Sequence, residues 1–189
     1  LIAFYSHDGG DPGSGGDGNY YFRADFFDLA YQAEQGNLDV YVAIATQLGD
    51  GGGQSFFPDN TKTQTDTAWR ICVAVYETNF GAIYTNQNGS KVDNSNFVTS
   101  QGGGISYWRA DLDSMEFGIK RQGLRNAGWD GVSPLYFQVI TVHDGTQAGG
   151  PGELPNRSDV IDYIVCPSCG GLNPNLGGGF GRLSGAVSS

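Results

Sequence analysis

The residues of this chain with the clearest potential for chemistry lie in a loop rich in glycine and aspartate. Asp8, Asp11 and Asp17 recur among glycines, and Asn19 follows them. Carboxylate and amide oxygens are ligands that Ca²⁺ prefers, and glycine lets the backbone bring its carbonyls close to an ion. The loop lacks the bidentate Glu that ends an EF-hand loop, so a solvated turn is the alternative interpretation. We predict a calcium site here. Asp25 either joins this site as a further ligand or faces solvent.

A second group of acidic residues lies further along the chain. Asp144 belongs to a His-Asp-Gly turn, whereas Asp159 and Asp162 lie at the start of a later strand. If the turn and the strand start meet in space, their carboxylates form a second set of oxygen ligands. We predict cation binding there on that condition.

The motifs of common hydrolytic sites do not occur in the sequence. His7 and His143 are its two histidines, and neither belongs to a G-x-S-x-G elbow or an H-E-x-x-H helix. Carboxylates are numerous, but no motif marks a facing pair of the kind that a glycosidase needs. We therefore expect a protein that is not an enzyme, with histidines that are structural or exposed to solvent.

Aromatic residues provide an alternative binding chemistry. Flat rings match the apolar faces of pyranoses, and tyrosine hydroxyls can hydrogen-bond to the rims of the sugars. In a domain of this size many aromatic residues belong to the core, which is the competing interpretation. The candidates for a glycan-binding platform are Tyr20, Tyr21, Tyr107, Trp108 and Trp129.

The cysteines and two sequons suggest covalent modification in an oxidising compartment. Cys166 and Cys169 form either a local disulfide or, through one of them, a link to Cys72, and the sequence leaves both pairings open. Asn88 and Asn156 each begin an N-glycosylation sequon.

Composition and charge narrow the class of protein. The 189 residues include 31 glycines, and the formal net charge is −10. Such an acidic chain lacks the clustered basic residues that nucleic acids require, so we exclude nucleic acid as a partner. No apolar run reaches the roughly 18 residues of a membrane span. The start, LIAFYS, is too short for the apolar region of a signal peptide, and we expect it to be the first strand of a mature extracellular chain.

Alternating apolar and polar residues predict an all-β fold. Short strands separated by turns favour an antiparallel β-sandwich, jelly-roll or Ig-like, of about nine strands. A barrel is the alternative. Residues 20–34 and 38–45 flank a Gln-Gly-Asn turn and are expected to form a hairpin, with the second strand buried on one face. We expect one domain over residues 1–165 and a Cys- and Gly-rich tail over residues 166–189.

Three segments carry a resemblance to a known group of domains. Residues 1–29 contain a strand, a Gly/Asp loop and an FDL strand, residues 136–146 read YFQV and then HDGT, and residues 157–164 read RSDVIDYI. This order resembles that of the CBM9/DOMON-like β-sandwiches, such as the C-terminal modules of glucodextranase and related bacterial extracellular glycosidases. The resemblance implies secretion, a structural calcium near the first loop and, in some members, sugar binding.

A looser likeness in architecture links the chain to the cannula-type tube proteins, which are calcium-dependent and polymerise by strand exchange. The two ends of this chain, LIAFYS and FGRLSGAV, are candidates for such exchanged strands. We therefore expect a self-associating structural subunit of an extracellular filament, tube or surface layer, a homo-polymer stabilised by calcium. A carbohydrate-binding module that recognises a polysaccharide is the alternative function.

Overall fold

The computed structural model describes residues 1, 3–26, 38–46, 53–58, 64–76, 80–86, 94–100, 103–109, 111–143 and 160–163. Among these described residues, helix α2 spans Arg121–Asn126. Within the described ranges, no helix has the length and hydropathy needed to cross a membrane. Short 3₁₀ turns occupy Pro12–Ser14 and Asn94–Asn96. The strands are β1 (Ala3–Asp8), β2 (Asn19–Asp25), β3 (Leu38–Ala45), β4 (Gln54–Phe56), β5 (Gln64–Trp69), β6 (Ile71–Val75), β7 (Gly81–Tyr84), β8 (Ser106–Arg109), β9 (Ser114–Lys120), β10 (Tyr136–His143) and β11 (Val160–Tyr163).

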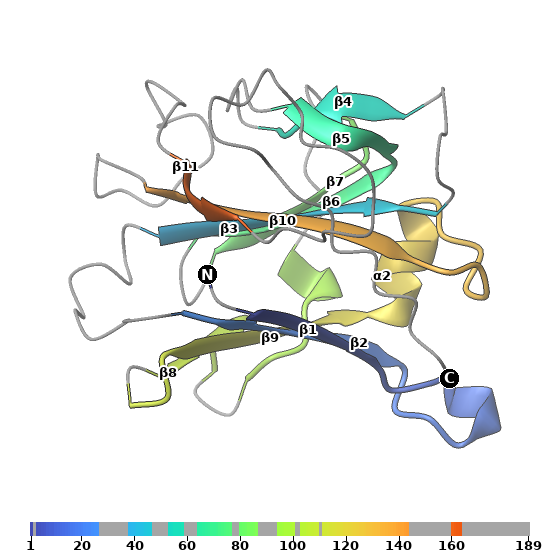
Figure 1. Cartoon of the computed structure of the whole chain (residues 1–189). Coiled ribbons are helices and arrows are strands. Elements are labelled where there is room, and N and C mark those ends of the chain that lie inside the picture. The colour runs from blue at the N-terminus through green and yellow to red at the C-terminus, as the bar shows by residue number, and fades with distance from the viewer. Residues whose placement is uncertain are drawn as a thin grey trace.

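Two antiparallel sheets pack face to face. The first, called sheet A, has the order β1-β2-β9-β8, and the second, called sheet B, has the order β11-β10-β3-β6-β7. Figure 1 shows the two sheets as separate layers, with the short pair β4-β5 lying beyond sheet B. The predicted all-β, antiparallel sandwich is therefore confirmed.

Side chains that alternate along the strands of sheet A fill the space between the two sheets. Successive residues of a strand point to opposite faces, so one set faces sheet B and the other faces outward. Phe22 lies at the centre of the inward set. Its ring stacks on that of Phe117, with the ring centroids 5.0 Å apart, and meets the ring of Phe137 of β10 edge-on, with the centroids 5.6 Å apart. Leu124 of α2 belongs to the same core and closes one end of it.

Strands β3 and β6 are buried on both faces, which corrects the expectation that residues 38–45 are half-buried. Every described residue of both strands is buried. The second face is covered by a smaller cluster in which Phe57 and Trp69 pack against Tyr41. Phe57 is 1% exposed and belongs to this cluster. Phe57 directly follows β4, and Trp69 is the last residue of β5.

The predicted hairpin between residues 20–34 and 38–45 is wrong. Strand β2 pairs with β1 and β9 in sheet A, whereas β3 pairs with β10 and β6 in sheet B. Residues 27–37, which include the expected turn, lie outside the described residues. Strands β2 and β3 therefore lie in different layers, and their apolar side chains share one core.

Replacing Phe22 by Ala should destabilise the domain by about 3–5 kcal/mol, because the change leaves a cavity at the centre of the aromatic core. Chemical denaturation of the two proteins measures this difference. Val132→Ala is the control, since Val132 is 85% exposed and its replacement should change the free energy of unfolding by less than about 0.5 kcal/mol. A Phe22→Ala protein as stable as the wild type would contradict the core described here.

Candidate functional site

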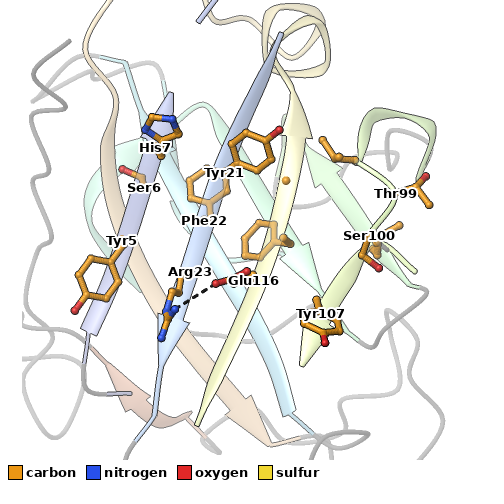
Figure 2. A pocket seen from close by; sticks show the side chains of 14 residues that line it. Tyr5, Ser6, His7, Tyr21, Phe22, Arg23, Thr99, Ser100, Tyr107 and Glu116 are labelled. Atoms are coloured by element: carbon orange, nitrogen blue, oxygen red, sulfur yellow. Dashed lines mark hydrogen bonds and ion pairs between the residues drawn. The ribbon is translucent and has the colours of Figure 1, made fainter. Parts of the chain in front are cut away.

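A hollow of about 710 Å³ lies on the outer face of sheet A. Outward-facing residues of all four strands form its floor, and the segment before β8 forms one wall. Figure 2 shows the labelled side chains spread across neighbouring strands rather than along one of them. The lining residues are Tyr5, Ser6, His7, Tyr21, Phe22, Arg23, Val98, Thr99, Ser100, Ile105, Tyr107, Glu116, Phe117 and Gly118.

Four of these residues form one row across the sheet, which we call row one. The strand register places Tyr5 opposite Arg23, Arg23 opposite Glu116, and Glu116 opposite Tyr107. Arg23 donates to Glu116 over 3.3 Å, and Figure 2 marks this ion pair near the middle of the row. Tyr5 and Tyr107 are 54% and 44% exposed, so an ion pair lies between two accessible rings.

A second row runs beside the first and deepens the hollow. The register places His7 opposite Tyr21 and Tyr21 opposite Gly118, and the amide of Val98 donates to the Gly118 carbonyl over 2.8 Å. The rings of His7 and Tyr21 stack with their centroids 6.3 Å apart. Gly118 has no side chain to fill the hollow, and a Cβ added there would lie only 2.9 Å from a methyl carbon of Val98. Thr99 and Ser100 add hydroxyl groups beyond Val98.

The glycine- and aspartate-rich loop orients Tyr21 within this hollow. The Tyr21 hydroxyl donates to the Asp17 carboxylate over 2.6 Å and accepts from the Asn19 amide over 3.0 Å. The first bond holds the pKa of the Asp17 carboxyl below its ordinary value and raises the pKa of the Tyr21 phenol. Stacking and hydrogen bonding together restrict the ring to one orientation, so it offers a fixed surface to a ligand.

Two carboxylates of the loop predicted to bind calcium pair with arginines. Asp8 forms an ion pair with Arg121, and Asp11 accepts from Arg125 over 2.5 Å. The loop continues the hairpin between β1 and β2 through its own backbone bonds, such as Asp17 N–H to the Gly9 carbonyl at 3.0 Å. These carboxylates are therefore oriented by protein groups rather than converging on one point.

Of the remaining metal-ligand candidates, the structure describes Asp25. Asp25 faces outward on β2 and accepts from Arg23 over 2.6 Å, while Asp144 and Asp159 lie outside the described residues. Among the residues that the structure does describe, no group of three or more His, Cys, Asp or Glu is placed to hold a metal ion. Calcium binding by the chain stays a prediction.

Arg121 joins three segments at the end of sheet A. Its side chain is 8% exposed, forms an ion pair with Asp8 and donates to the Gly131 carbonyl over 2.8 Å. The guanidinium carbon lies 4.6 Å from the centroid of the Trp129 ring. Its backbone amide donates to the Gly18 carbonyl over 2.8 Å. The first loop, the end of β9 and the segment after α2 are therefore held together by one side chain.

The aromatic residues predicted to bind glycans divide between the core and the hollow. Tyr20 and Trp129 are 2% and 5% exposed, and Trp108 points inward, where it stacks near Phe26. These three residues are excluded from an exposed platform, because each lies on the core side of its element. Burial also raises the pKa of Tyr20 to about 12. Tyr21 and Tyr107 do line the hollow.

Several residues of the hollow were not predicted from the sequence as a binding set. Tyr5 and His7 alternate with inward-facing residues of β1, and Arg23 and Glu116 are cross-strand neighbours from distant parts of the chain. The alternation on β1 is a signal in the sequence, whereas the strand pairing is not. His7 was expected to be structural or solvent-facing, and it is exposed and stacked on Tyr21.

The predicted covalent sites fall outside the part of the chain that the structure describes. This applies to Cys166 and Cys169 and to the sequon residues Asn88 and Asn156. Cys72 is buried in β6. The disulfide and the glycosylation sites stay predictions.

Comparison of the chain with protein-family models, with curated proteins and with solved structures finds no match. The resemblance to the CBM9/DOMON-like domains therefore rests on the three segments quoted above.

Replacing Arg121 by Met should destabilise the protein by about 3 kcal/mol, because it leaves the Asp8 carboxylate without its partner. The value lies at the low end for a broken buried pair, since Asp8 retains some contact with solvent. Arg125→Met is the matched control. Its pair with Asp11 is partly exposed and screened by solvent, so the loss should be much smaller than that of Arg121→Met. Equal effects in urea unfolding would contradict the special role of Arg121.

The pair between Arg125 and Asp11 predicts a response to acid. The hydrogen bond from Arg125 holds the pKa of the Asp11 carboxyl below 3.8, so its contribution to stability is present above that pH and lost as the pH falls through the folded-state pKa. Arg125→Gln should raise the Asp11 pKa toward 3.8, as measured by NMR titration of its carboxyl. Asp130, whose pKa is lowered by its own turn, is the internal control and should not move.

Proposed function

We propose that the protein is a non-catalytic carbohydrate-binding domain whose site is the hollow on sheet A. The observation that carries this proposal is row one, in which Tyr5 and Tyr107 flank the ion pair of Arg23 and Glu116 on an accessible face. An extracellular location, expected from the resemblance, belongs to the same proposal.

The chemistry of row one suits a sugar chain. Tyrosine rings cover the apolar C–H faces of pyranoses, and a guanidinium beside a carboxylate provides donors and acceptors for hydroxyl groups, which both donate and accept. Arg23 is already paired with carboxylates of its own chain, so the row binds polar groups without demanding an anionic ligand. The two rings and the pair thus alternate apolar and polar contacts, as the surface of a saccharide does.

The carboxylates of the hollow favour binding over hydrolysis. Glycosidases use two carboxyl groups on either side of the scissile bond. Among the described residues that line the hollow, Glu116 is the only carboxylate, and Arg23 engages it. This arrangement supports the non-catalytic form of the proposal.

The structural-subunit function expected from the sequence stays a prediction. Its main support, the tail over residues 166–189, lies outside the described residues. At the other end of the chain, β1 is an edge strand of sheet A and pairs with β2 of its own chain. The described residues therefore supply specific contacts for glycan binding, whereas self-association awaits a measurement of the oligomeric state.

Removing either exposed ring of row one should weaken polysaccharide binding. Tyr5→Ala and Tyr107→Ala each delete one stacking surface, worth about 1.5 kcal/mol or roughly a tenfold loss of affinity. Affinity electrophoresis with a panel of soluble polysaccharides, followed by calorimetry on those that bind, measures the effect.

Matched controls separate stacking from other causes. Tyr5→Phe and Tyr107→Phe keep the rings and should retain most of the affinity. Leu112→Ala removes an exposed apolar side chain in the turn between β8 and β9 and should have no effect. The proposed function would be overturned if the wild type bound none of the polysaccharides. It would also be overturned if both Ala variants bound every panel member as tightly as the wild type does.

A further inference from the structure

We infer that the ligand of the hollow is an uncharged, linear glycan that lies across the strands of sheet A and is bound along its length. This inference rests on the proposed function and adds the direction and the charge of the ligand. Two independent observations support it: the order of residues in row one, and the pairing of the cations around the hollow.

The direction follows from the strand register. Row one starts at Tyr5 on β1 and ends at Tyr107 on β8, and these are the two edge strands of sheet A. Strands lie 4.7–4.9 Å apart, so the row spans three spacings, or about 14 Å. A single sugar is too short to contact both rings, whereas a chain perpendicular to the strands contacts both rings and the ion pair between them.

The charge follows from the partners of the basic residues. Arg23 donates to Asp25 over 2.6 Å as well as to Glu116, so two carboxylates surround one guanidinium. Arg109, the next outward residue after Tyr107, is bound by Asp111 at 2.5 Å. Each nearby guanidinium is thus already committed to a carboxylate of its own chain.

The field of the whole chain acts in the same direction. With a net charge of −10, the protein repels polyanions before contact. A uronate or sulfate group placed at the middle of row one would lie beside Glu116 and would have to break an existing pair to reach Arg23. Hydroxyl groups face no such cost, so the site discriminates against acidic glycans.

The first test compares the affinities of the whole chain for neutral polysaccharides, for a uronate polymer and for an amino-sugar polymer, at low and at high salt. We expect affinity for at least one neutral polymer that is independent of salt, and affinity for the uronate polymer at least about tenfold weaker at low salt. Tighter binding of the uronate or amino-sugar polymer than of any neutral polymer would overturn the inference and leave the proposed function standing. Binding of none of the three classes would overturn both.

The second test changes the charge of row one. Glu116→Lys should raise the affinity for the uronate polymer at least tenfold and lower that for the neutral polymer, because it replaces the repelling acceptor by a cation. Glu116 is exposed, so the fold should tolerate the change. Asp130→Asn is the control, since it alters the net charge far from row one and keeps a turn acceptor for Ser133. An unchanged ratio of the two affinities in Glu116→Lys would contradict the assignment of the charge filter to row one.

The third test uses neutral oligosaccharides of increasing length. Affinity should rise until the ligand reaches from Tyr5 to Tyr107 and then level off. Tyr5→Ala and Tyr107→Ala should each move the plateau to shorter ligands. A monosaccharide that binds as tightly as the longest oligosaccharide would refute the cross-strand orientation.

Discussion

The buried guanidinium of Arg121 is the interaction on which the arrangement of sheet A depends. A buried charge is costly unless it is paired and hydrogen-bonded, and Arg121 meets this condition at its two terminal nitrogens, which bond to Asp8 and to the Gly131 carbonyl, while its guanidinium lies over the Trp129 ring. Because its backbone also bonds to Gly18, the residue ties the turn between β1 and β2 to the end of β9. The relative position of these three strands sets the rows of side chains on the outer face. A contact at one end of the sheet thus supports a binding surface at its middle.

The carboxylates that predict a metal site in the sequence, Asp8 and Asp11, pair with arginine in the structure. A carboxylate pairs with Ca²⁺ and with a guanidinium alike, because its oxygens coordinate the ion and accept hydrogen bonds from the N–H groups of the guanidinium. The arginines that pair with Asp8 and Asp11 lie 113 and 114 residues further along the chain, so spacing within the loop contains no sign of them. Only the helical turn of α2, which follows β9 directly, brings Arg121 and Arg125 to the loop.

Local alternation was sufficient to predict most strands, but not their partners. Residues 38–45 were predicted as a strand because their side chains follow a period of two, and they form β3 at the centre of sheet B. The error lay in the connection before Leu38, where turn residues suggested a hairpin although the two segments belong to different sheets. A turn signal shows that the chain changes direction, and it does not show whether the next strand pairs with the last one or packs on it. Burial of β3 on both faces depended on β4 and β5, whose polar sequence gave no comparable signal.

The division of the predicted aromatic set has a simple geometric cause. Tyr20 and Tyr21 are neighbours in β2, and Tyr107 and Trp108 are neighbours in β8, so each pair must point to opposite faces of sheet A. The two-residue period of a strand shows that only one member of each pair can face a ligand on the outer side of the sheet. It does not show which member that is. The similar sequences YFRAD and YWRAD, over residues 21–25 and 107–111, contain a further clue. In each of them the tyrosine and the arginine are two residues apart and lie on the same face of the sheet. These segments flank β9 from opposite sides, and Glu116 of β9 pairs with Arg23 from one repeat and faces Tyr107 from the other. The two similar segments therefore contribute to one site because β9, which carries Glu116, lies between them in sheet A.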